Sequence, residues 1–170
     1  MPRIHVCSLA RLPETLASSG ASHVLTLLGN RAKMERPAAI RPDRYEAVLV
    51  SDVVAAQEGH VLPAEEHVAR ILAFARAWDR EKPLLIHCYA GVSRSTAAAY
   101  IAACALMPER DEGEMARVLR AASPTATPNR LFVEIGDGLL GRRGRMVAGI
   151  AAIGRGEDCF EGTPFHIPLD

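Results

Sequence analysis

Residues 87 to 96, HCYAGVSRST, have the types and spacing that phosphate chemistry requires. A short apolar segment ends at Cys88, Arg94 follows six residues later, and hydroxyl side chains and an alanine-rich segment come next. The N-terminus of a helix leaves amide N–H groups unpaired, and a preceding loop that turns its own amides inward makes a cradle for an anion. Gly91 permits the backbone angles of so tight a turn.

Cys88 would stand at the mouth of this cradle, where the positive field favours the thiolate, the nucleophilic form of sulfur. Arg94 adds a planar fork that can bind two oxygens of one phosphate. Taken alone, a cysteine after an apolar strand is usually a small buried core residue. A glycine turn between a strand and a helix is also common in α/β proteins. The joint pattern predicts instead a nucleophilic sulfur beneath a bound phosphate.

The elements that must position this loop follow from hydrophobic patterning. Apolar residues recur at helical spacing from Val68 to Trp78, whereas short apolar runs bounded by turn residues read as strands. Strands are expected at residues 4–9, 23–28, 45–50 and 84–87, and helices at 12–18, 63–78, 95–106, 114–122, 130–140 and 145–153. This order predicts an α/β three-layer sandwich around a central, mostly parallel sheet of four to five strands, with a helical C-terminal half.

Length and composition indicate one folded domain, residues 1–170, with residues 141–170 as a helical and extended C-terminal extension. Hydrophobic residues make up 49% and charged residues 24%, and the formal net charge is zero. That balance gives no electrostatic footprint for a nucleic acid or an anionic membrane. The longest apolar stretch, residues 97–107, is shorter than the about 20 residues that a membrane span needs. The N-terminus is too polar for a secretory signal, so we expect a cytoplasmic protein.

The stretch HCYAGVSRS resembles the signature of protein tyrosine phosphatases, and it is most similar to the dual-specificity branch of that superfamily. Asp52 ends a predicted strand, where these enzymes usually carry an acidic residue on a movable loop. Residues 128–132, PNRLF, look like the segment that opens a late helix in the same branch. The resemblance covers roughly residues 4–140, whereas residues 141–170 match nothing in the family. As a whole, the chain is similar to small bacterial tyrosine phosphatase-like proteins, and a cysteine-phosphatase-like fold is implied.

The resemblance also implies a catalytic set of Cys88, Arg94, Asp52 and Ser95. Cys88 would attack phosphorus and form a cysteinyl-phosphate. Asp52 would protonate the leaving group and then take a proton from the attacking water. Ser95 would hydrogen-bond the sulfur, and His87 would support the loop. The implied phosphate-binding residues are Tyr89, Ala90, Gly91, Val92, Ser93 and Arg94.

The implied reaction is hydrolysis of phosphotyrosine, with phosphoserine and phosphothreonine as further substrates. No metal and no organic cofactor enter it, and the expected partner is a phosphorylated protein or a small phosphomonoester. The absence of lysine from the loop disfavours phosphoinositides. Two alternatives remain: a rhodanese-like sulfurtransferase, which also presents a loop cysteine, and a non-catalytic phosphate-recognition module. Substrate preference and oligomeric state stay open.

Several other residues compete for roles. Glu58 and Asp43 are rivals of Asp52 for the general acid, and His60 is a candidate substrate contact. Cys7 is a candidate resolving thiol for Cys88. The four cysteines are far apart and histidine spacing matches no zinc pattern, so no metal site is expected. The basic stretch at residues 142–145 is expected to be a solvated helix start, with docking of an acidic partner as its alternative.

Overall fold

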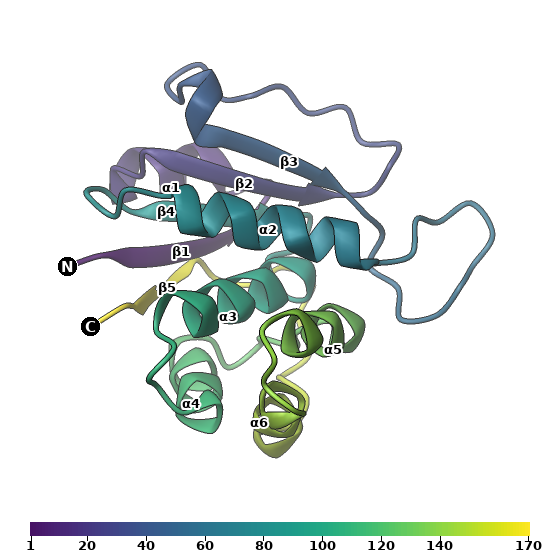
Figure 1. Ribbon diagram of the computed structural model, residues 1–170. Coiled ribbons are helices and arrows are strands. Elements are labelled where there is room, and N and C mark those ends of the chain that lie inside the picture. Colours follow the sequence, from purple (N-terminus) through teal and green to yellow (C-terminus); the bar gives the residue numbers. More distant parts are fainter.

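The computed structural model describes residues 1–170 and has a central five-stranded sheet with helices on both faces (Figure 1). The strand order is β3-β2-β4-β1-β5, in which β5 alone is antiparallel to its neighbour. The strands are β1 (Arg3–Ser8), β2 (His23–Leu28), β3 (Tyr45–Leu49), β4 (Leu84–Cys88) and β5 (Phe165–Pro168). The helices are α1 (Leu12–Ser19), α2 (Glu65–Ala77), α3 (Arg94–Leu106), α4 (Glu112–Ala122), α5 (Arg130–Leu139) and α6 (Arg145–Ile153), with a 3₁₀ turn η1 at Pro42–Arg44.

The predicted α/β architecture with a mostly parallel sheet is confirmed, and most boundaries lie within two residues of those expected. Two elements differ from the expectation. The turn η1 lies in a segment expected to be loop, and β5 was expected only as extended chain. β5 has four residues, contains a proline and pairs with β1 from the opposite end of the sequence. Pairing over such a separation leaves little local sequence signal.

Cys88 ends β4, which lies beside β2 in the middle of the sheet. Every residue of both strands is buried, because helices or loops cover both faces of the sheet. Strands of a parallel sheet covered in this way have mostly apolar sequences without alternation. One face packs against α2 and α3 in a cluster of 34 buried residues. The other packs against α1 and the β2–β3 connection through Leu12 and Ile40. Cys88 therefore ends a rigid central strand.

The C-terminal helices α4, α5 and α6 gather beside α3, on the side away from β3 (Figure 1). The hydroxyl of Tyr100 donates to the backbone oxygens of Glu112, at 3.0 Å, and Met146, at 3.3 Å. Glu112, buried at the start of α4, accepts from Arg142 and Arg145, each at 3.0 Å. The expectation of a solvated basic stretch at residues 142–145 is therefore wrong for Arg142, whose side chain is largely buried, whereas Arg143 and Arg145 are exposed as expected. The hydrogen bonds from Arg145 hold the pKa of Glu112 below its usual range.

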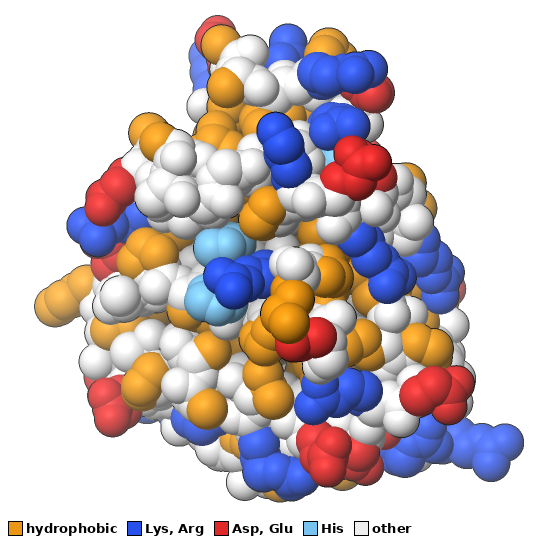
Figure 2. Space-filling view, turned by 90° about the vertical axis from the view of Figure 1, so that its left-hand side faces the viewer, with side chains coloured by type: hydrophobic (Ala, Val, Ile, Leu, Met, Phe, Trp, Pro, Cys, Tyr) orange, Lys and Arg blue, Asp and Glu red, His pale blue; other side chains and the backbone are white.

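The face that carries both chain ends shows basic, acidic and hydrophobic side chains interspersed, without a large patch of one charge (Figure 2). None of the helices has the length and apolar character needed to cross a lipid bilayer.

Candidate active site

The loop from Cys88 to Arg94 joins the carboxyl end of β4 to the first turn of α3. In open parallel sheets, ligands bind in the crevice outside these carboxyl ends. Gly91 turns the loop with a φ of 72°. A Cβ at this position would lie 2.8 Å from the backbone of Cys7 and Ser8 in β1. Glycine is therefore required twice, for the positive φ and for the close approach of the loop to β1.

The carbonyl groups of this loop point outward, where N–H groups from three separate segments hold them. The amide of Leu9 donates to Tyr89 O at 3.1 Å, and that of Gly162 donates to Ala90 O at 2.8 Å. Two further bonds run from Thr127 N to Val92 O, 2.9 Å, and from Asn129 N to Ser93 O, 3.2 Å. No turn or loop hydrogen bond uses the amides of Tyr89, Ala90, Val92 or Ser93 as donors. These amides are thus left free to bind an anion, as the sequence predicted.

The sulfur of Cys88 lies beneath these amides and is almost fully buried. It contacts Ser95 Oγ at 3.0 Å and accepts from the amide of Gly91 at 3.3 Å. The expected Ser95–sulfur contact is therefore present.

Arg94 extends from the first turn of α3 across the site. Its Nη1 donates to the carbonyl of Val50 at 3.0 Å, which ties the catalytic loop to the end of β3. Its Nε is buried and has no partner. A buried donor without a partner is costly unless a ligand completes it. The guanidinium is thus suited to donate to an oxygen of a bound tetrahedral anion.

Asp52 stands just after β3 and is held beside the loop from two sides. Its Oδ1 accepts from Ser93 Oγ at 2.7 Å and from Asn129 Nδ2 at 2.8 Å, while its Oδ2 makes no hydrogen bond. Asn129 also donates to Val53 O and, as the N-cap of α5, accepts from the amide of Phe132. The sequence placed Asn129 at a helix start, but its contact with Asp52 was missed, since the two lie 77 positions apart.

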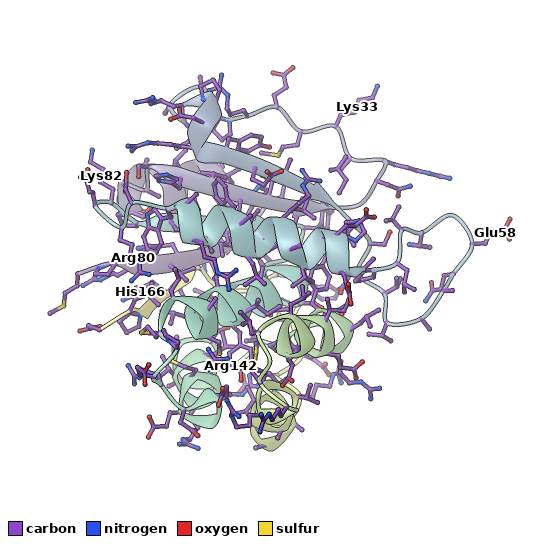
Figure 3. The ribbon with its side chains drawn as sticks, in the orientation of Figure 1. Lys33, Glu58, Arg80, Lys82, Arg142 and His166 are labelled. Atoms are coloured by element: carbon purple, nitrogen blue, oxygen red, sulfur yellow. The ribbon has the colours of Figure 1, made fainter.

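The rivals of Asp52 lie elsewhere. Asp43 belongs to η1, which precedes β3 and therefore lies at the amino ends of the parallel strands, whereas Cys88 lies at their carboxyl ends. Both carboxylate oxygens of Asp43 accept hydrogen bonds from Arg41. Glu58 stands at the outer tip of the β3–α2 connection and points into solvent (Figure 3). Of the three acidic candidates, Asp52 alone is joined by a hydrogen bond to the loop that carries Cys88.

A cavity of about 540 Å³ opens above the loop. Its polar lining includes Asp52, His60 and Arg94, so His60, a candidate substrate contact, lies at this cavity. Lys33, from the β2–β3 connection, also lines it and was missed by sequence reasoning. The chain has only two lysines, and this scarcity was the only feature of the sequence that could have drawn attention to Lys33. The other lining residues are Leu9, Leu28, Gly29, Ala32, Ser51 and Tyr89.

His87 supports the loop from below, as expected. The carbonyl of Cys88 can only accept, so His87 Nδ1 donates to it at 3.4 Å, and Nε2 then accepts from Thr26 Oγ1 at 2.8 Å. Burial lowers the pKa of His87 to about 4, partly opposed by the hydrogen bond to Cys88 and assisted by the charge of Arg94. A neutral imidazole at this place fixes β4 against β2.

The other cysteines lie in different surroundings. Cys7 packs with Leu12 and Leu85 on one face of the sheet, whereas Cys88 belongs to the core cluster of the other face. Burial raises the pKa of Cys7 to about 11 and that of Cys104 to about 12, so both stay protonated. All four cysteines are free, and no group of three or more metal-binding side chains occurs.

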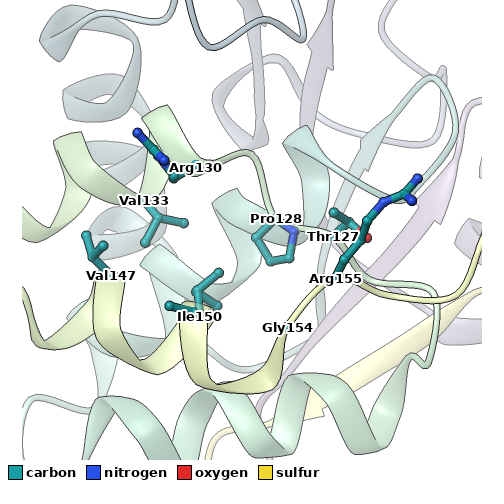
Figure 4. Close-up of a pocket in the computed structure, with 9 residues that line it drawn as sticks. Thr127, Pro128, Arg130, Val133, Val147, Ile150, Gly154 and Arg155 are labelled. Atoms are coloured by element: carbon teal, nitrogen blue, oxygen red, sulfur yellow. The ribbon is translucent and has the colours of Figure 1, made fainter.

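A separate apolar cavity of about 380 Å³ lies between α5 and α6 (Figure 4). Val133, Val147 and Ile150 form its apolar wall, and Arg130 and Arg155 lie at its margins. Its lining contains no cysteine and no acidic side chain.

No family sequence model and no curated protein sequence matches this chain. Solved structures do match it. The structure of DUSP15 has a TM-score of 0.61 at 16% identity and covers 88% of this chain and 89% of its own. The Cydia pomonella PTP-2 phosphatase has a TM-score of 0.61 at 19% identity, covering 79% and 84%. Human DUSP28 has a TM-score of 0.59 at 20% identity, covering 82% and 89%. The chain therefore has the fold of dual-specificity and tyrosine phosphatases.

Proposed function

We propose that this protein is a cysteine-dependent phosphomonoesterase that hydrolyses phosphotyrosine through a cysteinyl-phosphate intermediate, with phosphoserine and phosphothreonine as further substrates. One observation carries the proposal: the buried sulfur of Cys88 lies in a loop whose carbonyls at Tyr89, Ala90, Val92 and Ser93 are bonded to neighbouring segments, which leaves the amides of these residues free. The similarity of the fold to solved phosphatases supports it. On this proposal, residues 1–170 act as one phosphatase domain, because the extension at 141–170 supplies α6 and the sheet strand β5.

The first step forms the intermediate. The Cys88 thiolate attacks phosphorus in line, the P–S bond forms and the bond from phosphorus to the leaving oxygen breaks. The free amides of the loop and the Arg94 guanidinium stabilise the three equatorial oxygens as charge redistributes. Asp52 gives its proton to the departing oxygen. Its Oδ2, which makes no other hydrogen bond, is free to carry that proton.

The second step releases phosphate. The Asp52 carboxylate takes a proton from water, the resulting hydroxide attacks phosphorus and the P–S bond breaks. Ser95, 3.0 Å from the sulfur, donates a hydrogen bond to the thiolate as it leaves. No step requires a metal.

The walls of the cavity support an aromatic phosphoester. Leu9, Leu28 and Tyr89 line the same space as Arg94, so a phenyl ring would meet apolar side chains while its phosphate reaches the loop. Asp52 and Ser95 also favour phosphatase over sulfurtransferase activity, because persulfide transfer needs no general acid. The intact pair of Cys88 and Arg94 disfavours a module that only binds phosphate.

The test is hydrolysis of p-nitrophenyl phosphate and of phosphotyrosine, phosphoserine and phosphothreonine peptides. We expect turnover in the presence of a metal chelator, inhibition by vanadate and the highest kcat/KM with phosphotyrosine. Transfer of sulfur from thiosulfate to cyanide without phosphatase activity would establish the sulfurtransferase alternative. Tight binding of phosphopeptides without turnover would establish the recognition module.

A further inference from the structure

The segment between α6 and β5, residues 154–164, packs against the outer side of the catalytic loop. Gly162 donates to Ala90 O at 2.8 Å, and Glu161 accepts from Ser8 Oγ. A Cβ at Gly162 would lie 2.7 Å from Gly91 O, so the two backbones are in direct contact. The position of this segment is thus fixed relative to the nucleophile.

The same segment presents Phe160 at full exposure, next to an opening in the surface. A fully exposed phenylalanine beside an apolar hollow is the kind of surface that binds a partner. The hollow has a volume of about 400 Å³ and is lined by Leu9, Ala10, Tyr89, Ala90, Phe160 and Glu161. It is therefore mainly apolar, with one carboxylate.

Leu9 and Tyr89 line both this hollow and the catalytic cavity, so the two spaces lie side by side and share a wall. Tyr89 is 70% exposed and forms part of that wall. A phosphotyrosine held over Cys88 would place a neighbouring residue of its peptide at this hollow. Free p-nitrophenyl phosphate is too small to reach it.

We propose that this hollow is a subsite for an apolar side chain adjacent to phosphotyrosine in a peptide substrate, with Phe160 as its specificity-determining residue. The inference rests on the proposed phosphatase function and names its substrate class. Leu9, Tyr89 and Phe160 supply apolar contact to the side chain. Glu161 repels an acidic residue at the same position, because two carboxylates would meet in a half-enclosed space.

The experiment compares three phosphotyrosine peptides that differ only in the two residues flanking phosphotyrosine: leucine, glycine or aspartate. An apolar side chain entering a matching pocket changes kcat/KM by about 10-fold or more. We expect the order leucine, glycine, aspartate, with about 10-fold between the first two. Phe160→Ala is expected to reduce the leucine-to-glycine ratio to about 2-fold, whereas Phe160→Leu retains most of it. Glu161→Gln is expected to raise kcat/KM for the aspartate peptide relative to glycine.

Leu139→Ala is the matched control, since Leu139 is an exposed apolar residue at the end of α5, outside both cavities. It is expected to keep the wild-type peptide order. Equal kcat/KM for all three peptides, with p-nitrophenyl phosphate still hydrolysed, would overturn the subsite but leave the phosphatase function standing. An equal loss with all substrates in Phe160→Ala would reduce the segment to a support of the loop and overturn the subsite. No hydrolysis of any phosphoester by the wild type would overturn both proposals.

Discussion

The loop that carries Cys88 and the connection that carries Asp52 meet at one site but are held in different ways. Four backbone hydrogen bonds from separate segments fix the first, and its glycine touches β1. The second is closed at its neck, where Ser51 N donates to Val61 O and Val61 N donates to Ser51 Oγ, both at 3.0 Å. Side chains of the site hold only its first residues, Asp52 and Val53. Every residue from Val54 to His60 is exposed. A nucleophile and anion cradle need exact placement, whereas an acid that must approach and leave a substrate needs freedom to move.

The largest loss is expected from changes to the fixed loop. Cys88→Ser should reduce turnover to the background rate, because a serine hydroxyl at this site is not ionised. Arg94→Lys should cost about 10²–10³-fold in kcat, since a point charge cannot replace the planar fork. Steady-state kinetics with p-nitrophenyl phosphate measures both. Cys88→Ser should still bind vanadate or phosphate, and turnover within a few-fold of wild type in that variant would refute the mechanism.

Asp52→Asn tests the connection between β3 and α2, which carries Asp52. A general acid contributes about 10²–10⁴-fold, and most when the leaving group is poor. The loss of kcat should therefore be large with phenyl phosphate and smaller with p-nitrophenyl phosphate, whose leaving group is stable as an anion. The variant should also lose the limb of the pH–rate profile that reports the protonated acid. Equal losses with both esters would assign Asp52 a structural role only.

A third prediction concerns how the stability of the fold depends on pH through His87, the residue before Cys88. Burial lowers the pKa of His87 to about 4 in the folded chain, whereas in the unfolded chain the pKa has its ordinary value of 6.5. Between these two pH values the unfolded chain binds a proton at His87 and the folded chain does not. The contribution of neutral His87 to the free energy of unfolding is therefore fully present above pH 6.5, and it is lost as the pH falls toward 4. Its loss between pH 7 and 4.5 amounts to about 2 kcal/mol. In urea titrations, His87→Gln should therefore lose less free energy of unfolding over this range than wild type. His60→Gln, at an exposed position of the other connection, should behave as wild type, and a slope unchanged in His87→Gln would contradict the assignment.

The smallest effect is expected where the two regions are joined. Asn129→Ser keeps a side-chain oxygen that can cap α5 but removes the Nδ2 donor to Asp52. We expect kcat to fall about 10-fold with phenyl phosphate and less with p-nitrophenyl phosphate, the pattern of Asp52→Asn on a smaller scale. The melting temperature should stay near the wild-type value. A uniform loss with both esters, or a clear fall in melting temperature, would mean that Asn129 acts through the fold rather than through the acid.

The difference between the two regions also explains what could be predicted from the sequence. The strand, cysteine, glycine, arginine and helix of the fixed loop are consecutive, so their chemistry is visible in a short stretch. The anchors of the loop, such as Thr127 and Gly162, come from distant segments and donate through the backbone, which has no sequence signal. Lys33 reaches the cavity from an irregular connection, whose path no periodicity predicts.

Arg142 was misassigned for the same reason. Its charge indicates solvent exposure, but its partner Glu112 lies in another helix and is itself buried. Position in the fold, rather than residue type, decided the environment of Arg142, whereas Arg145 is exposed as expected. Helices and strands were well predicted, because they depend on the local period of hydrophobic residues. The contacts of individual side chains were not predicted, because they depend on proximity in three dimensions.

The hydrogen bond from Gly162 to Ala90, together with β5 on β1, has a consequence for biosynthesis. Residues 162–168 leave the ribosome after all six helices, yet Gly162 bonds to the loop after β4 and β5 pairs with β1. Contacts between such distant segments form late, because their loop closure must be met before they stabilise the chain. A nascent chain can therefore carry folded helices around an unfinished anion cradle. Activity should accordingly appear abruptly once residues 162–168 have emerged from the ribosome, not in proportion to the length of chain already made.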